Sequence, residues 1–266
     1  MDNRWTLRDL NEVVQWCSLR NTQGIRCTIA TLTEYAKTPD QALQSFELNI
    51  DCIKTIAEHS LNSSLSVKPT SIGILFDRNE YFRNLNLLFH EAQDHHVGFE
   101  IDMEGRNFVA DTLYSALELA KEKQPVTVAL QAYLDRTFQD IDLCKMNGIS
   151  VRLVKGSYFG DRNDFATIKS KMQQYVEKLL SKQTLFSIGT HDPELIEWLK
   201  NQITKQKNLV EFGFLKGLAD RTKIEMVSQG YQIAEYVPFG PKGDAYILRR
   251  ERYLETLKQL NRSPVP

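Results

Sequence analysis

The sequence lacks the features that mark several classes of protein. Its 266 residues carry 33 lysines and arginines against 34 aspartates and glutamates, so the formal net charge is −1 and no basic block suits nucleic acid. No apolar run approaches the roughly 18 residues that a membrane-spanning helix needs. The N-terminus shows no signal-peptide pattern. We therefore expect a cytoplasmic protein without a nucleic-acid partner.

Cysteines are few, and they form no C-x-x-C pair, which argues against a zinc site and is typical of a reducing compartment. The adjacent His95 and His96 precede an expected strand, and we interpret them as a helix-end feature rather than metal ligands. No H-E-x-x-H, P-loop or Ser-His-Asp arrangement occurs. The sequence therefore predicts no metal site. The four cysteines are Cys17, Cys27, Cys52 and Cys144.

Short apolar segments alternate with longer amphipathic ones, such as 111–123 and 165–182. Eight strand–helix units at a mean spacing of roughly 30 residues are typical of an α/β protein with a (β/α)₈ barrel of TIM type. A doubly wound open sheet is the alternative, and it is less favoured because no G-x-G-x-x-G follows the first strand. We expect one domain: an N-terminal helical extension over 1–23 and the barrel over 24–266. The expected strands are 26–31, 65–69, 98–102, 126–131, 150–156, 185–190, 209–214 and 232–239.

The C-terminal ends of the strands are where a barrel of this class places its functional residues. Cations outnumber acids there and on the segment after the last strand, which favours an anionic ligand. No pair of carboxylates has an obvious acid/base partner, so we infer that a cofactor supplies the difficult chemistry. The polar strand-end residues include Lys68, Asp102, Glu104, Gln131, Tyr133, Arg152, Lys155, Thr190, His191, Asp192, Glu211 and Tyr236.

Several of these residues have two interpretations. Arg152 stands among apolar residues and must be paired when buried, either with an internal acid such as Asp102 or with a ligand. Lys68 raises the same question, again with Asp102 as a candidate partner. His191 either caps the following helix or contacts a ligand.

The segment "YVPFGPKGDAYILRRERYLE", residues 236–255, carries two adjacent arginines. If the run after Pro241 is helical, Tyr246 shares a face with Arg249 and Arg250. Two guanidiniums on one face can hold a carboxylate in two-pronged fashion. The alternative is an ordinary charged helix exposed to solvent, since the charged run continues.

The strand-end motifs, read as a set, resemble the FAD-dependent proline dehydrogenases, both the monofunctional enzymes and the matching domain of bifunctional proline-utilisation flavoenzymes. The resemblance covers roughly Gly24 to Arg250. It implies a distorted barrel with its last helix over the mouth. The motifs that carry it are "SVKPTSIG", "EIDME", "LQAY", "VRLVKGSYF", "GTHD", "EFGFLKG" and "YVPFGPKGDAYILRR".

The resemblance also implies roles for individual residues. The proline carboxylate is held by Arg249, Arg250 and Lys68, with Asp102 beside them, and these four are the expected catalytic residues. The substrate ring is enclosed by Tyr236, Tyr246 and Leu215. The residues expected to contact the flavin cofactor are Gln131, Arg152, Val154, Gly156, Tyr158, Thr190 and His191.

The implied reaction is the first step of proline catabolism, oxidation of L-proline to Δ1-pyrroline-5-carboxylate by hydride transfer to FAD. A quinone or other membrane electron acceptor is the implied partner, which predicts peripheral contact with a membrane, and a separate pyrroline-5-carboxylate dehydrogenase would use the product. This sequence departs from the family in a short 156–190 segment, in Tyr253 where glutamate is common, and in Gly213 where glutamine is common.

Two other functions stay open on sequence grounds. One is a barrel lyase or aldolase with Lys155 or Lys68 as a Schiff-base nucleophile. The other is a non-catalytic barrel that binds an amino acid. A yellow protein that proline bleaches would distinguish the first hypothesis from both.

Overall fold

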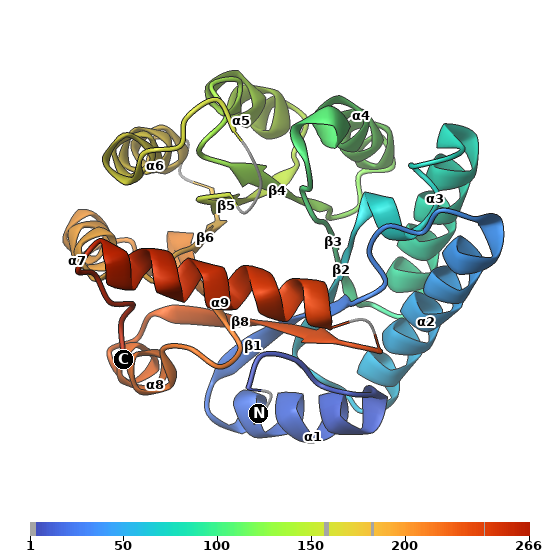
Figure 1. The fold of residues 1–266 in the computed structure, drawn as a ribbon, viewed down its shortest axis with the longest axis horizontal. Coiled ribbons are helices and arrows are strands. Elements are labelled where there is room, and N and C mark those ends of the chain that lie inside the picture. The colour runs from blue at the N-terminus through green and yellow to red at the C-terminus, as the bar shows by residue number, and fades with distance from the viewer. Residues whose placement is uncertain (1–3, 157–159, 182–183, 242) are drawn as a thin grey trace.

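Eight parallel strands close into a barrel in chain order, from β1 next to β2 round to β8 next to β1 (Figure 1). The computed structural model describes residues 4–156, 160–181, 184–241 and 243–266. The predicted barrel is thereby confirmed, and a closed ring excludes the open doubly wound sheet. The strands are β1 Ile25–Thr31, β2 Ser63–Val67, β3 Gly98–Ile101, β4 Thr127–Gln131, β5 Ser150–Val154, β6 Phe186–Gly189, β7 Val210–Leu215 and β8 Gln232–Phe239.

Helices surround the strands, and their boundaries follow local capping chemistry. Pro39 opens α2 behind the N-cap Thr38, and Pro193 opens α7 behind the N-cap Asp192, whose carboxylate accepts from the Glu194 N–H. The helices are α1 Leu10–Thr22, α2 Pro39–Glu58, α3 Arg78–Asp94, α4 Val109–Ala120, α5 Thr137–Met146, α6 Phe165–Leu180, α7 Pro193–Gln202, α8 Asp220–Ser228 and α9 Asp244–Gln259. No helix within the described ranges is long and apolar enough to cross a bilayer.

The interior of the barrel is charged at its middle. Arg26 of β1 makes two 2.7 Å hydrogen bonds to Glu211 of β7. Arg152 of β5 pairs with Glu100 of β3 through bonds of 2.9 and 2.7 Å. Because successive strand residues point to opposite faces, these polar residues alternate with apolar ones that pack under the helices.

The last helix and the segment before α1 both lie next to β8. In Figure 1, α9 runs across the ring beside β8, and α1 lies on the other side of β1 and β8. Before α1, Leu7 forms a parallel bridge with Phe239 at the end of β8. The helix that carries the two arginines therefore sits where the first and last strands meet, as the predicted position over the mouth requires.

Candidate active site

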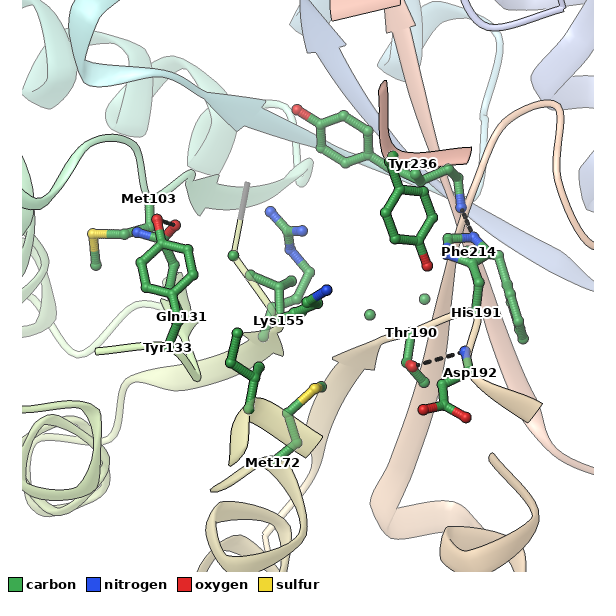
Figure 2. A pocket seen from close by; sticks show the side chains of 18 of the residues that line it. Met103, Gln131, Tyr133, Lys155, Met172, Thr190, His191, Asp192, Phe214 and Tyr236 are labelled. Atoms are coloured by element: carbon green, nitrogen blue, oxygen red, sulfur yellow. Dashed lines mark hydrogen bonds between the residues drawn. The ribbon is translucent and has the colours of Figure 1, made fainter. Parts of the chain in front are cut away.

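A cavity of about 420 Å³ opens at the carboxyl ends of the strands (Figure 2). Its lining brings together every predicted site residue that the structure describes, and Tyr158 lies outside the described residues. Strand ends supply most of them and α9 supplies the rest. They are Lys68, Asp102, Gln131, Arg152, Val154, Gly156, Thr190, His191, Leu215, Tyr236, Tyr246, Arg249 and Arg250.

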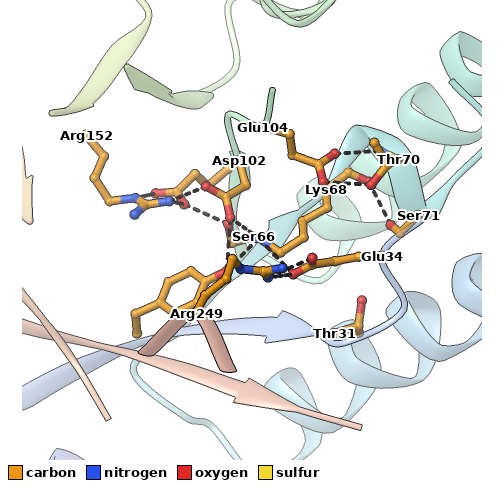
Figure 3. A network of polar contacts seen from close by, with 12 residues as sticks. Thr31, Glu34, Ser66, Lys68, Thr70, Ser71, Asp102, Glu104, Arg152 and Arg249 are labelled. Atoms are coloured by element: carbon orange, nitrogen blue, oxygen red, sulfur yellow. Dashed lines mark hydrogen bonds and ion pairs between the residues drawn. The ribbon is translucent and has the colours of Figure 1, made fainter. Parts of the chain in front are cut away.

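Asp102 is the centre of a buried network of polar contacts (Figure 3). Its carboxylate accepts from Lys68 Nζ, from Tyr236 Oη at 2.9 Å and from Arg152 Nη2 at 2.9 Å. Lys68 Nζ also donates to Tyr236 Oη at 3.1 Å. The ion-pair interpretation of Arg152 and Lys68 is confirmed, because each cation is paired with Asp102. Both also line the cavity, and their contact with a ligand stays a prediction.

The charges of this network are fixed at neutral pH. Burial disfavours the carboxylate of Asp102, but the cations Lys68 and Arg152 outweigh it and hold its pKa well below the usual range. Burial likewise disfavours the Arg152 cation, but Glu100 and Asp102 raise its pKa. Burial raises the pKa of Tyr236, so its hydroxyl keeps its proton. Asp102 therefore serves as a counter-ion rather than as a base.

The arginine pair sits as the spacing in the sequence predicted. Tyr246 is buried, and the guanidinium carbons of Arg249 and Arg250 lie 5.9 and 5.1 Å from its ring centre. Arg249 Nη2 donates to both carboxylate oxygens of Glu34 at 2.7 Å. One carboxylate oxygen of Glu34 also lies 4.0 Å from Lys68 Nζ. The Glu34 carboxylate therefore lies next to both Arg249 and Lys68. The positions of these two cations suit a carboxylate group.

Two glycines interrupt the side chains of the opposite wall of the cavity, formed by β5 to β7. Gly189 of β6 and Gly213 of β7 are register partners and both line the cavity. A glycine in a strand interior marks a close approach by a ligand or by another backbone. Gly189 and Gly213 therefore leave room between the side chains of this wall.

Tyr133 supports the loop beyond β5. A Cβ on Gly156, whose φ is +115°, would stand 1.8 Å from the Tyr133 ring, so only glycine fits there. The Tyr133 hydroxyl donates to Gln131 Oε1 at 2.6 Å, and Gln131 Nε2 donates to the Glu104 carbonyl at 2.8 Å. These two bonds fix the Gln131 amide with one N–H and one oxygen lone pair left over.

His191 is held as a neutral ring. Burial, with Lys223 and Arg250 nearby, lowers its pKa to about 3. Its Nε2 accepts from the Leu215 N–H at 3.0 Å, which leaves Nδ1 as the protonated nitrogen. The neighbouring Asp192, not His191, caps α7. His191 therefore has a donor to offer in the cavity.

Sequence reasoning missed two acids around this site, Glu100 and Glu34, and the burial of a third. Glu100 pairs with Arg152, and it could have been found because it stands two residues before Asp102 on the same strand face. Glu34 lies in a loop and carries no signal that it meets Arg249. Glu104 was noted, but not its burial, which raises its pKa to about 7 against hydrogen bonds from Thr70.

Comparison with known proteins agrees with this geometry. A family model described as "Proline dehydrogenase" matches residues 14–252. The chain belongs to the proline dehydrogenase family. It is similar to proline dehydrogenase 2 of Bacillus subtilis, with 32% identity over 91% of this chain and 82% of that protein. Proline dehydrogenase 1 of the same organism is 30% identical over 86% of this chain and 78% of its own length.

Solved structures show the same fold. The proline utilization A protein of Bdellovibrio bacteriovorus, inactivated by N-propargylglycine, superposes with a TM-score of 0.83 at 20% identity. That match covers 92% of this chain but only 32% of the other, so this chain spans about a third of the larger protein. The family membership makes this chain an oxidoreductase that acts on proline in its catabolism, in a family of flavoenzymes.

Proposed function

We propose that this protein oxidises L-proline to Δ1-pyrroline-5-carboxylate with FAD as its cofactor. The observation that carries the proposal is the pairing of Arg249 with Glu34 beside Lys68, inside a cavity whose opposite wall contains two paired glycines. The cations match the carboxylate of an amino acid, and the glycines leave room for a cofactor ring to approach that wall. Both halves of the reaction therefore have a place in one cavity.

The substrate side is formed by β2, β3, β8 and α9. Arg249, Arg250 and Lys68 bind the proline carboxylate, and Arg249 exchanges its bond to Glu34 for one to the substrate. Asp102 keeps the Lys68 ammonium charged and directed. Tyr236, Tyr246 and Leu215 enclose the pyrrolidine ring. Fixed orientation of the reacting carbon is worth several kcal/mol of the barrier in general.

The cofactor side is formed by β4 to β7. Gln131 presents one N–H and one lone pair, which suit the alternating donors and acceptors of a flavin pyrimidine ring. Arg152 contributes positive charge, which stabilises a reduced, anionic ring. Val154, Gly156 and Thr190 line the same wall, and the Nδ1–H of His191 is a donor for a phosphate or hydroxyl group. The bound FAD would supply the hydride acceptor.

The lysine-based alternative has unequal support at its two lysines. Lys68 Nζ is engaged in an ion pair with Asp102, which makes it a poor nucleophile. Burial lowers the pKa of Lys155, whose ammonium lies 4.5 Å from the Phe165 ring centre. Lys155 is therefore the residue that a Schiff-base test should address.

The purified protein tests these functions by its colour. We expect a yellow protein whose flavin absorbance is bleached by L-proline without oxygen, with pyrroline-5-carboxylate formed. A colourless protein that borohydride traps at Lys155 with a carbonyl compound would contradict the proposal. Reoxidation by a soluble quinone analogue, and then by quinone in vesicles, tests the proposed acceptor and peripheral membrane contact. Consumption of the product by an added pyrroline-5-carboxylate dehydrogenase tests the proposed partner.

A further inference from the structure

The N-terminal segment Arg4–Leu7 lies against the back of the arginine-bearing helix. Trp5 is only 2% exposed, although it precedes the first helix, and its Nε1 donates to Glu251 Oε1 at 2.5 Å. The Arg4 guanidinium stands 4.5 Å from the Trp5 ring centre and covers it. The family match covers residues 14–252, so Arg4 and Trp5 lie outside the matched region and Glu251 lies inside it.

The segment meets α9 at two levels. A Cβ on Gly243, just before the helix, would lie 3.3 Å from Thr6 Oγ1, and Glu251 is bonded to Trp5. Eight residues of α-helix rise about 12 Å. Arg249 and Arg250 fall within that interval.

These contacts lie on a different face of α9 from the cavity. Gly243, Ile247 and Glu251 follow one another at intervals of four residues, and a Cβ on Gly243 would touch Ile247 as well as Thr6. Tyr246 and Arg250, also four apart, form the face that lines the cavity. The helix is therefore held from behind by one face while the other serves the site.

The segment is itself attached to the rigid barrel. The Leu7 N–H donates to the Pro238 carbonyl at 3.0 Å, and the Gly240 N–H donates to the Leu7 carbonyl at 3.0 Å. Lys216 Nζ donates to the Arg4 carbonyl at 2.8 Å. The position of the segment is thus set by β8 and by the loop that follows β7.

We propose that Trp5 is a positioning residue that sets the height and rotation of α9, so that Arg249 and Arg250 reach the substrate carboxylate. The proposal rests on the proposed role of the arginine pair. Trp5 touches neither substrate nor cofactor. Trp5 holds Glu251 by a hydrogen bond, and Arg250 is the residue immediately before Glu251 in α9. The anchored residue and the two arginines lie within one helical turn.

Trp5→Phe and Glu251→Ala test the anchor, because each removes the hydrogen bond and leaves the fold of the barrel intact. A hydrogen bond to a charged group contributes enough to change an equilibrium about tenfold. We therefore expect KM for proline to rise about five- to tenfold in either variant, with kcat and flavin content little changed. The double variant should resemble the single ones, since the same bond is lost. Glu251→Gln, which keeps an acceptor oxygen, should recover most of the affinity.

Glu255→Ala, an exposed position one turn further along α9, is the matched control and should leave KM unchanged. Unchanged KM in both single variants, or effects that add in the double variant, would overturn the proposal. Hydrogen exchange of the α9 amides gives a second readout that needs no substrate. Faster exchange over 244–259 in Trp5→Phe is expected, and unchanged exchange rejects the anchor. If the unmodified protein does not oxidise proline, the proposed function is wrong. The hydrogen-exchange result then tests the Trp5–Glu251 anchor independently.

Discussion

Glu235 and Tyr236 are neighbours in β8, yet their side chains belong to two different buried charge clusters. Tyr236 points inward to the pocket cluster of Lys68, Asp102 and Arg152. Glu235 points outward to a lateral cluster, where it accepts from Lys223 Nζ, from Arg20 and, at 2.6 Å, from Trp16 Nε1. Asp220 completes the lateral cluster by pairing with Arg20 and Lys223.

The two clusters are alike in burial and pairing but differ in access. The side chains of Lys223 and Glu235 are both fully buried, and none of the lateral residues lines the cavity. The pocket residues line it. Burial and ion pairing therefore do not distinguish a functional cluster from a structural one, whereas contact with a cavity does.

Lys223→Met should give the largest effect, and the effect should be on stability. Lys223 is the buried partner of both Glu235 and Asp220, although Glu235 keeps its contacts with Arg20 and Trp16. Removing one partner of a buried ion pair destabilises a protein by about 3–5 kcal/mol. We expect that loss in urea unfolding of the protein, with kcat/KM of the folded fraction unchanged. A large loss of activity at full stability would show that the lateral cluster serves the site.

Lys68→Met makes the same substitution in the pocket cluster and should give the opposite pattern. Asp102 keeps its bonds from Arg152 and Tyr236 and also borders the cavity, where water can replace Lys68, so the stability loss should be smaller than for Lys223→Met. A charge-assisted bond to the substrate carboxylate contributes about 1.5–3 kcal/mol, so kcat/KM should fall roughly ten- to a hundredfold. Steady-state kinetics and urea unfolding of both variants are the measurements. If the two variants lose the same stability and the same kcat/KM, the proposed difference between the clusters is wrong.

Arg249→Met should raise KM for proline roughly ten- to a hundredfold, because one arm of the carboxylate clamp is lost. Flavin content should stay the same, since Arg249 belongs to the proposed substrate side of the cavity, where it pairs with Glu34. Flavin absorbance per protein and KM are the two measurements. An unchanged KM here and in Arg250→Met would return α9 to the status of an ordinary charged helix.

His191→Gln should give the smallest effect. Burial lowers the pKa of His191, and Lys223 of the lateral cluster and Arg250 of the cavity add to the shift. The folded pKa of His191 is about 3 and the unfolded pKa about 6.5, so the unfolded chain binds the extra proton between these values. Stability from this group is full above pH 6.5 and is lost as pH falls. Between pH 7 and 5 the loss is about 2 kcal/mol, and the variant should lack it.

Melting temperatures across that pH range are the measurement for His191. His59→Gln, at an exposed position, is the control and should keep the slope of the unmodified protein. An equal slope in His191→Gln would mean that other groups produce the acid destabilisation.

The fold was predictable because strand periodicity and spacing are local properties of the sequence. At the majority of strand ends, the expected boundary differs from the observed one by one or two residues. The expected strand 65–69, for example, is observed as Ser63–Val67. Strand ends of a parallel barrel meet at one face, so Lys68, Arg152 and His191 could be placed in one site without knowing any contact. Their individual roles, and the division into a 1–23 extension and a 24–266 barrel, stay predictions.

The contacts that sequence reasoning missed are made by segments far apart in the chain. Glu34 meets Arg249 only because a loop after β1 approaches α9, and neither neighbourhood contains a pattern that points to the other. Trp5 and Glu251 are separated by almost the whole chain. Charge and hydrophobic periodicity report the face on which a residue lies, but not which distant partner will occupy it.

The pairing of β1 with β8 has a consequence for synthesis on the ribosome. β1 and β8 are paired along their whole common length, from Ile25↔Ile233 to Thr31↔Phe239, and Leu7 continues the contact to the end of β8. β1 emerges early and must wait for nearly all of the other strands before its second neighbour exists. Such long-range pairing folds slowly and leaves strand edges open to other chains. We therefore expect a nascent chain stalled before β8 to bind chaperones preferentially. Once β8 has emerged from the ribosome and paired with β1, the chain should dissociate from the chaperone.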